Sequence, residues 1–191
     1  MSNLFTTENL KHTCKVLPIV KVQIYQNEIG LVVKKEHLLS VLKFLKNHIQ
    51  YQFKMLTCVS GVDYPENKNR FKIVYELLSV RYNTRIRVKV LTDELTPIES
   101  AGEIFPAANW YESEIWDMYG VFFVGHCNLT RLLTDYGFEG YPLRKDFPLS
   151  GFVEASYDYT RKRVSNERVE LSQEFRSFKF SSPWDTLELN K

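Results

Sequence analysis

Three short apolar runs in the first half of the chain decide the fold: FKMLTCVSGV (Phe53–Val62), FKIVYELLSV (Phe71–Val80) and RIRVKVL (Arg85–Leu91). Each run is rich in β-branched and aromatic residues, which favour strands. The segments between the runs, 64–69 and 82–84, are polar and typical of turns. This pattern predicts three consecutive strands joined by turns.

The residues before these runs continue the pattern. Ile19–Tyr25 alternates apolar and polar residues, Gln26–Gly30 reads as a turn, and Leu31–Val33 is apolar, which together predict a hairpin. In Glu36–Ile49 leucines recur every three or four residues, as on one face of a helix. A shorter amphipathic helix is expected over Leu4–Leu17.

The order helix, two strands, helix, three strands indicates an α+β fold. In such a two-layer domain the helices cover one face of a mixed sheet. We expect this domain to span residues 1–92. An acidic helix and a signature segment rich in Gly, Pro and aromatic residues would then occupy 93–151, and an irregular, partner-wrapping extension 152–191.

Arg85, Arg87 and Lys89 share one face of the third strand, because side chains alternate along a strand. Such a face could bind phosphate or RNA, meet an acidic partner, or lie in solvent. Nucleic-acid recognition on a sheet also needs exposed stacking aromatics, so the residues favour the other two interpretations.

Composition excludes several classes of protein. The 25 Lys and Arg nearly balance the 23 Asp and Glu, so nothing indicates nucleic acid or an anionic membrane as a general partner. No apolar run approaches the roughly 18 residues of a membrane span, and the N-terminus lacks the pattern of a cleavable targeting segment. Three widely spaced cysteines indicate neither a disulfide framework nor a metal site.

Trp110–Tyr119 predicts a helix, with Asn109 as N-cap, Glu112 completing a capping box and Gly120 at the C-terminal end. Glu114 and Asp117 fall on one face. Paired carboxylates could serve acid–base catalysis or hold a metal. With no histidine at helical spacing, they are better explained by the helix dipole and by pairing with an arginine of a neighbouring segment.

After a brief strand at Val121–Val124 the chain is punctuated by glycine and proline and crowded with aromatic rings. Irregular backbone with many rings needs another surface to cover it. About forty further residues after Phe152 cannot form a core of their own. The sequence therefore predicts a permanent partner.

His126 and Cys127 suggest a nucleophile or a metal ligand, and His126 with Asp135 a hydrolase. Adjacent side chains of an extended segment point apart, however, and no nucleophile elbow, phosphate loop or dinucleotide motif is present. Enzymatic activity of the isolated chain is not indicated.

Arg144-Lys145-Asp146 lies between Pro142 and Pro148, which hold its backbone. A held guanidinium could dock on a carboxylate of another protein. It could equally tie the segment back to Glu114 or Asp117. Both possibilities remain open at this level.

The stretches Glu112–Phe123, Leu129–Gly140 and Pro142–Leu149 closely resemble the signature of the NADH dehydrogenase subunit 9 family, the thirty-kilodalton subunit of respiratory complex I. The resemblance covers about residues 38–185, and the tail looks like that of the mitochondrial members. It implies that the signature residues lie at subunit interfaces: Glu112, Glu114, Asp117, Gly120, His126, Arg131, Asp135, Tyr136, Gly137, Gly140, Pro142, Arg144, Lys145, Asp146 and Pro148.

The resemblance further implies a core, non-catalytic subunit in the hydrophilic arm, on the matrix side of the mitochondrial inner membrane. It would pack beside the forty-nine-kilodalton-type and PSST-type subunits and touch the membrane only through the complex. Flavin (FMN), iron–sulfur clusters and quinone would be bound by other subunits, and none by this chain. The same module in a plastid or hydrogenase-related complex is the alternative.

The sequence departs from the family pattern at five positions of the signature: Ser113, Cys127, Asn128, Thr130 and Tyr141. The family usually has Arg at the first and fourth of these positions and His at the last. The glycine and proline framework is unaffected.

Overall fold

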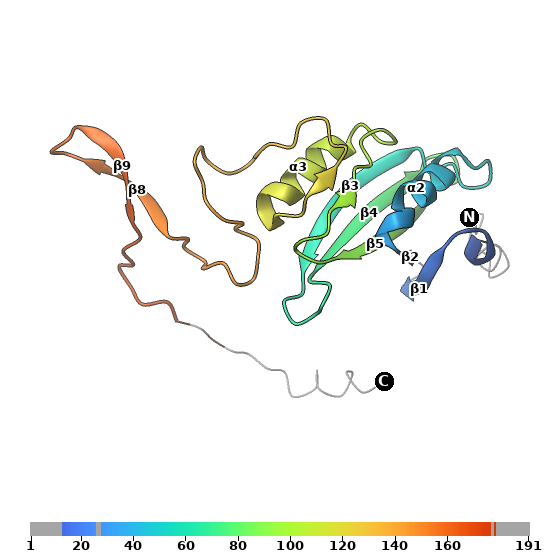
Figure 1. Ribbon diagram of the computed structural model, residues 1–191, viewed down its shortest axis with the longest axis horizontal. Coiled ribbons are helices and arrows are strands. Elements are labelled where there is room, and N and C mark those ends of the chain that lie inside the picture. Colours follow the sequence, from blue (N-terminus) through green and yellow to red (C-terminus); the bar gives the residue numbers. More distant parts are fainter. Residues whose placement is uncertain (1–12, 26–27, 177, 179–191) are drawn as a thin grey trace. The chain divides into compact units, whose positions relative to one another are not determined.

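A five-stranded mixed sheet organises the first part of the chain (Figure 1). The computed structural model describes residues 13–25, 28–176 and 178. The strands lie in the order β1-β2-β5-β4-β3; β2 and β5 are parallel and the other neighbours antiparallel. Their bounds are Ile19–Tyr25 (β1), Glu28–Val33 (β2), Met55–Asp63 (β3), Phe71–Ser79 (β4) and Thr84–Thr92 (β5). The predicted α+β fold with a mixed sheet is confirmed.

Alternating side chains give strand β5 one apolar face. On β5 the side chains of Ile86, Val88 and Val90 are buried, whereas Arg85 and Leu91 on the other face are exposed. Side chains along a strand point alternately to its two faces, so the sequence pattern translates directly into one packed and one solvated surface.

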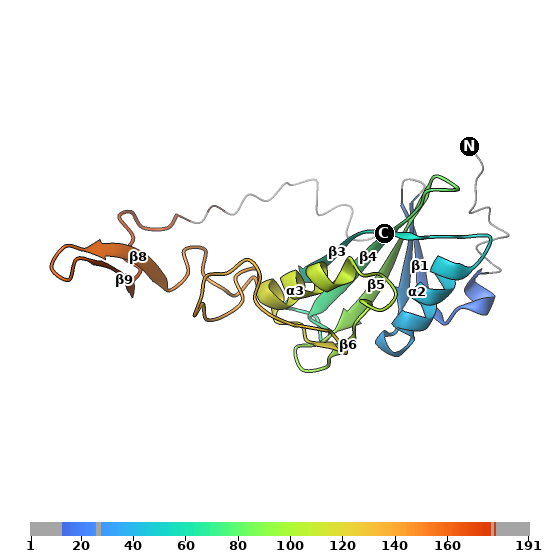
Figure 2. The same ribbon diagram turned by 90° about the horizontal axis from the view of Figure 1, so that it is seen from above.

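Helix α2 (Leu38–Asn47), preceded by the 3₁₀ turn η1 (Lys35–His37), covers part of the apolar face (Figure 2). Its buried leucines and Val41 are fully enclosed, as their spacing predicts. The predicted turn ends early, because β2 already begins at Glu28. Of the predicted helix over 4–17, residues 13–16 are helical and the residues before them lie outside the described part.

The first compact unit continues beyond the five-stranded sheet. Helix α3 (Ala108–Tyr119) packs against β3, and the short strands β6 (Ile98–Glu99) and β7 (Phe123–Val124) pair in parallel with each other. The first compact unit accordingly ends at Phe147. The boundary expected near residue 92 is therefore corrected: apolar residues after it, such as Phe105 and Ile115, belong to the same core.

The second unit begins at Pro148. It contains a hairpin of β8 (Val153–Asp158) and β9 (Arg163–Arg168), so the extension expected to be irregular is partly regular. The pairing places Tyr157 opposite Val164 on one face of the hairpin, and both side chains are exposed. A two-stranded hairpin without a covering layer is marginally stable in water.

Candidate functional site

Helix α3 is anchored to the sheet through its aromatic residues. The Tyr111 hydroxyl donates to the Thr57 carbonyl oxygen at 3.0 Å, and the Tyr119 ring lies over Gly61. The helix begins two residues before Trp110, so Asn109 lies inside it and is not the N-cap; the residue at that position, Ala107, makes no side-chain cap. Gly120 ends the helix with φ +78°, as predicted.

Glu112 is fully buried, yet it caps a loop rather than its own helix. Its carboxylate accepts hydrogen bonds from the Ser100 hydroxyl at 2.6 Å and from the Ala101 N–H at 2.8 Å. Burial raises the pKa of Glu112, and these two hydrogen bonds oppose that rise. The predicted capping box does not form, because the side chain points into the core instead of back along α3.

Asp117 organises the loop that follows β7. One carboxylate oxygen accepts the backbone N–H groups of Leu132, Leu133 and Thr134 at 2.8–3.1 Å. The other accepts the Thr134 hydroxyl at 2.7 Å and Arg131 Nη1 at 3.0 Å. Burial acts to raise the pKa of Asp117, but the hydrogen bonds prevail and hold it below the usual range.

The carboxylates of Glu114 and Asp117 therefore have different surroundings. Asp117 is saturated by donors from a neighbouring loop, as the structural interpretation of the sequence expected, and Arg131 is the pairing arginine. Glu114 is half-buried and makes no hydrogen bond or ion pair with any residue that the structure describes. Within the same described residues, no group of three His, Cys, Asp or Glu side chains could hold a metal ion.

The guanidinium of Arg131 joins the two ends of the loop over residues 131–141. It donates to the Gly140 carbonyl oxygen at 3.1 Å and lies within 5.4–5.8 Å of the ring centroids of Trp116, Phe138 and Tyr141. Cations are attracted to aromatic faces at these separations. The aromatic residues of the signature segment therefore enclose a charge of their own chain.

Arg144 also points inward. Its Nε donates to the Tyr119 carbonyl oxygen at 2.7 Å, a carbonyl left open where α3 ends. The guanidinium lies 4.6 Å from the Tyr141 ring centroid and 3.6 Å from a Glu94 carboxylate oxygen. Of the two possibilities left by the sequence, the internal one is found, but with partners other than Glu114 and Asp117.

Gly120 makes this approach of Arg144 possible. A Cβ built on Gly120 would lie 2.7 Å from both Arg144 Nη2 and the Tyr141 ring. Tyr141, which stands where the family usually has His, thus forms one wall of the Arg144 site.

A second arginine, Arg70, joins the signature segment to the sheet. It binds Asp63 in bidentate fashion at 2.7 and 2.9 Å, and reaches Glu94 at 2.6 Å and Asp146 at 2.8 Å. The backbone N–H of Lys145 donates to Asp63 at 2.8 Å. The hydrogen bond from Arg70 is the main cause of the lowered pKa of Asp63.

Sequence reasoning missed Asp63, Arg70 and Glu94 as members of this site. Asp63 and Arg70 are seven residues apart, but their other partners are distant in sequence and no spacing rule connects them. The stretch GVDYP (Gly61–Pro65) also resembles the family pattern, but it carries no indication of which residue its aspartate binds.

His126 has both ring nitrogens occupied. Nε2 lies 2.9 Å from the Asn109 carbonyl oxygen, and Nδ1 accepts the Asn128 N–H at 3.1 Å, which places the proton on Nε2. Asp135 instead accepts the N–H of Tyr136. The described residues show no hydrogen bond between His126 and Asp135, so the hydrolase arrangement is not formed.

Apolar side chains of the same region face solvent. Tyr136 is fully exposed, next to Gly137 at φ +74°, and further large apolar residues are more than half exposed: Trp110, Phe122, Leu133 and Leu143. At Gly140 the Phe147 ring packs where a side chain would stand. Pro142 is half-buried and Pro148 opens the second unit. Asp117, Arg131 and Arg144 thus point inward, whereas several apolar residues of the signature point outward.

Comparison with known proteins assigns the chain to a family. Residues 31–153 match the family described as the respiratory-chain NADH dehydrogenase, 30 Kd subunit. The chain belongs to this family. The match includes most of the sheet after β1, α3 and the signature segment, so membership rests on the folded unit and not on one motif.

Relatives from this family resemble most of the chain. NADH-ubiquinone oxidoreductase subunit 9 of Reclinomonas americana is 56% identical over 87% of this chain and 81% of its own length. An NADH-quinone oxidoreductase subunit of Chelativorans sp. (strain BNC1) is 58% identical over 83% of this chain and 80% of its own length. In Beta trigyna, NADH dehydrogenase [ubiquinone] iron-sulfur protein 3 is 55% identical over 78% of both chains.

The fold of this family also occurs in a solved structure of the membrane-bound sulfane sulfur reductase, an archaeal respiratory membrane complex. A chain of that complex superimposes with a TM-score of 0.64 and 25% sequence identity, covering 75% of this chain and 85% of its own length. The similarity supports the two-layer α+β fold described above.

Proposed function

We propose that this chain is a structural subunit of a respiratory NADH:quinone oxidoreductase and carries no catalytic site of its own. Membership of the respiratory-chain NADH dehydrogenase family supports the first part. Hydride transfer from NADH and reduction of quinone would take place on other subunits. In the same proposal FMN, iron–sulfur clusters and quinone are bound by those subunits.

The name of one relative refers to an iron–sulfur protein, so the thiols of this chain bear on the proposal. The common clusters are held by four thiolates. The chain has three cysteines, which lie far apart in the sequence: Cys14, Cys58 and Cys127. They do not suffice for such a cluster, which agrees with the proposed absence of a cofactor in this chain.

The observation that carries the proposal is the orientation of the signature side chains. The groups that could have done chemistry, Asp117, His126 and Arg144, are engaged by their own chain. Large apolar side chains, notably those of Leu133 and Tyr136, are left at the surface. Exposed aromatic and aliphatic residues beside a rigid loop suit a protein interface and not a reaction centre.

The partners in this proposal are the forty-nine-kilodalton-type and PSST-type subunits, next to the quinone site. The complex would lie at the mitochondrial inner membrane with this chain on the matrix side, since one relative is named as subunit 9 of an NADH-ubiquinone oxidoreductase. No helix of the described residues is long and apolar enough to cross a membrane. Finding the chain in thylakoid membranes instead would favour the plastid alternative.

Isolation of the native complex in mild detergent tests the assignment. We expect the chain to co-migrate with NADH:quinone reductase activity. In a Leu133→Ser and Tyr136→Ser double variant the amount of assembled complex should fall, because apolar contact area is lost. Ile49→Ser, which changes an exposed apolar residue just after α2, should assemble normally. Equal assembly of both variants would argue against the signature surface as an interface.

The absence of intrinsic catalysis is tested separately. His126→Ala removes the one imidazole of the signature segment. We expect an assembled complex carrying this variant to keep its turnover per complex, with any loss appearing as reduced assembly. A normal amount of complex with a specific loss of quinone reduction would contradict a purely structural role.

A further inference from the structure

The sheet face turned away from the helices carries an excess of positive charge. Strand β5 contributes Arg85, Arg87 and Lys89 to it, β4 contributes Lys72 and β1 contributes Lys21. The alternation of side chains that buries the apolar residues of these strands against α2 places the basic residues together on the opposite face.

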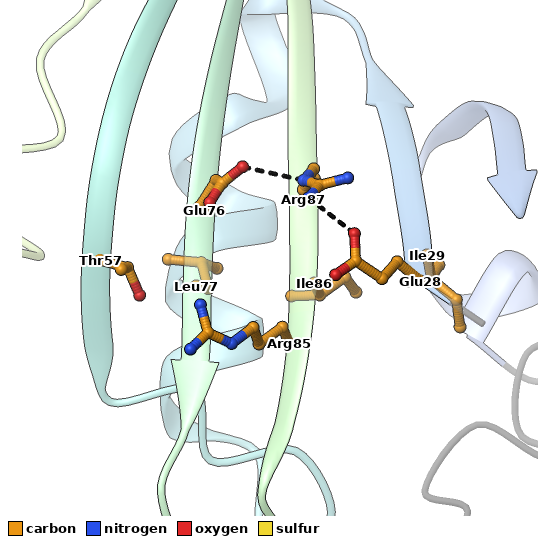
Figure 3. A pocket seen from close by; sticks show the side chains of 8 residues that line it. All are labelled: Glu28, Ile29, Thr57, Glu76, Leu77, Arg85, Ile86 and Arg87. Carbon is orange, nitrogen blue, oxygen red and sulfur yellow. Dashed lines mark hydrogen bonds and ion pairs between the residues drawn. The ribbon is translucent and has the colours of Figure 1, made fainter. Parts of the chain in front are cut away.

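The two acidic side chains of this face already form ion pairs. Glu28 of β2 lies 2.6 Å from Arg87, and Glu76 of β4 lies 2.8 Å from it, so both carboxylates pair with one guanidinium (Figure 3). Among the described residues the remaining bases, Lys21, Lys72, Arg85 and Lys89, have no carboxylate partner. The charge of this face is therefore compensated only around Arg87.

A hollow of about 400 Å³ opens on the same face beside β1. Its lining includes Gly30, which has no side chain, and Lys21, Tyr25 and Arg87. Lys89 extends across Gly30 and donates from Nζ to Gln23 Oε1 at 2.7 Å. A neutral amide is thus the main partner of a partly buried ammonium group.

The electrostatics of Lys89 reflect this arrangement. Burial lowers the pKa of Lys89, and the nearby cations Lys72 and Arg87 lower it further. The positive charges of the face therefore repel one another in the free chain. An anionic group placed in the hollow would relieve that repulsion and form a charge-assisted hydrogen bond with the ammonium.

We propose that this face binds an acidic segment of another polypeptide, with one carboxylate entering the hollow and taking the place of Gln23 beside Lys89. The inference extends the proposed function, on which it rests for the source of the polypeptide, a further subunit of the complex. It adds a second docking surface, on the sheet and separate from the signature segment.

A discrete carboxylate fits this face better than a nucleic acid or an anionic membrane does. Glu28 and Glu76 remain on the face and would repel a continuous row of phosphates. Recognition of bases on a sheet also needs several exposed aromatic rings. Tyr25 is the one aromatic residue that lines the hollow among the residues described.

Labelling of lysines in the intact complex tests the proposal. We expect Lys21 and Lys89 to react with an acetylating reagent about tenfold more slowly in the complex than in the isolated full-length chain, because an interface excludes solvent. A carbodiimide should join one of them directly to an Asp or Glu of another subunit. Equal labelling in both states, or amide formation only within this chain, would overturn the proposal.

A binding assay identifies the kind of partner. The full-length chain is titrated with a fluorescent glutamate-rich peptide and with an RNA of equal length. We expect peptide binding about tenfold weaker in the Lys21→Gln, Lys89→Gln double variant, since charge pairs at an interface contribute on this scale. Lys43→Gln, an exposed lysine of α2, should bind like the unaltered chain. Tighter binding of RNA, or no effect of the double variant, contradicts the proposal.

These experiments separate two failures. If the chain does not co-migrate with the reductase, the proposed function is wrong. If it co-migrates while Lys21 and Lys89 stay fully reactive, the assignment to the complex holds and the acidic docking surface is wrong.

Discussion

Arg70 Nη2 lies 2.8 Å from Asp146 Oδ1, although 76 residues separate the two in the sequence. The same guanidinium holds the buried Asp63 and the exposed Glu94, so one side chain connects the end of β3, the loop after β5 and the signature segment. The short loop Arg144–Asp146 is thereby fixed to the sheet from one side, and by Tyr119 from the other.

The contacts of Arg70 should contribute unequally to the free energy of unfolding. Arg70→Met leaves the carboxylate of Asp63 buried without its main partner, which we expect to destabilise the chain by about 3 kcal/mol. Asp146→Asn removes a largely exposed partner and should cost at most about 1 kcal/mol. Urea unfolding of the isolated chain measures both. Equal effects would show that the network acts as an exposed surface cluster.

Loss of the Asp117 carboxylate should loosen the loop over residues 131–141. In Asp117→Asn one of the two acceptor oxygens becomes an amide that faces N–H donors, so buried donors lose their partner. We expect a loss of about 2 kcal/mol. Glu114→Gln, three residues away on α3 and without a described polar partner, is the matched control and should stay near zero. Thermal unfolding distinguishes the two variants.

Stability should fall in acid more steeply than for a chain with ordinary carboxyl groups. The pKa values of Asp63, Asp117 and Asp146 are all lowered in the folded state. Depressed folded pKa values give stability that is present above the unfolded value of about 4 and is lost as pH falls through the folded values. Denaturant unfolding from neutral pH down to strongly acidic pH checks this, and Asp63→Asn should flatten the decline.

Two Gly→Ala variants distinguish the destabilisation caused by backbone strain from that caused by steric crowding. Gly120 and Gly125 have nearly the same positive φ, +78° and +77°. A Cβ at Gly120 would meet Arg144 and Tyr141, whereas at Gly125 nothing lies within 4 Å. Gly125→Ala should therefore cost about 1 kcal/mol from the left-handed backbone alone, and Gly120→Ala at least about 1 kcal/mol more. Similar losses in urea unfolding would show that Arg144 moves aside freely.

The hairpin β8–β9 should gain its protection from partners. Its apolar face, including Tyr157 and Val164, is exposed in the chain itself. Hydrogen exchange on the isolated chain should show residues 153–168 exchanging quickly and β4 and β5 slowly, since local opening depends on buried contacts. In the assembled complex the hairpin amides should become slow. Strong protection of the hairpin in the free chain would contradict the partner requirement.

Local patterns in the sequence determined the elements of this protein. The alternation of Ile86, Val88 and Val90 with basic residues predicted β5 and its two faces, and Gly120 correctly ended α3. Period and turn chemistry act within a few residues, so they can be read without knowing where a segment will lie. The linked glycine and proline motifs after α3 likewise identified the family.

Only the tertiary structure decided which groups meet. Glu112, expected to cap its own helix, binds Ser100 and Ala101; Arg144 binds the Tyr119 carbonyl and Glu94; and Arg70 was not expected at all. The partner of a charge is set by the order of strands and by the packing of α3 on β3, which bring distant segments together. The spacing of residues in the sequence does not predict which distant segments come into contact. The signature therefore indicated the family, while the fold showed that Asp117, Arg131 and Arg144 bind groups of their own chain and that Leu133 and Tyr136 remain at the surface.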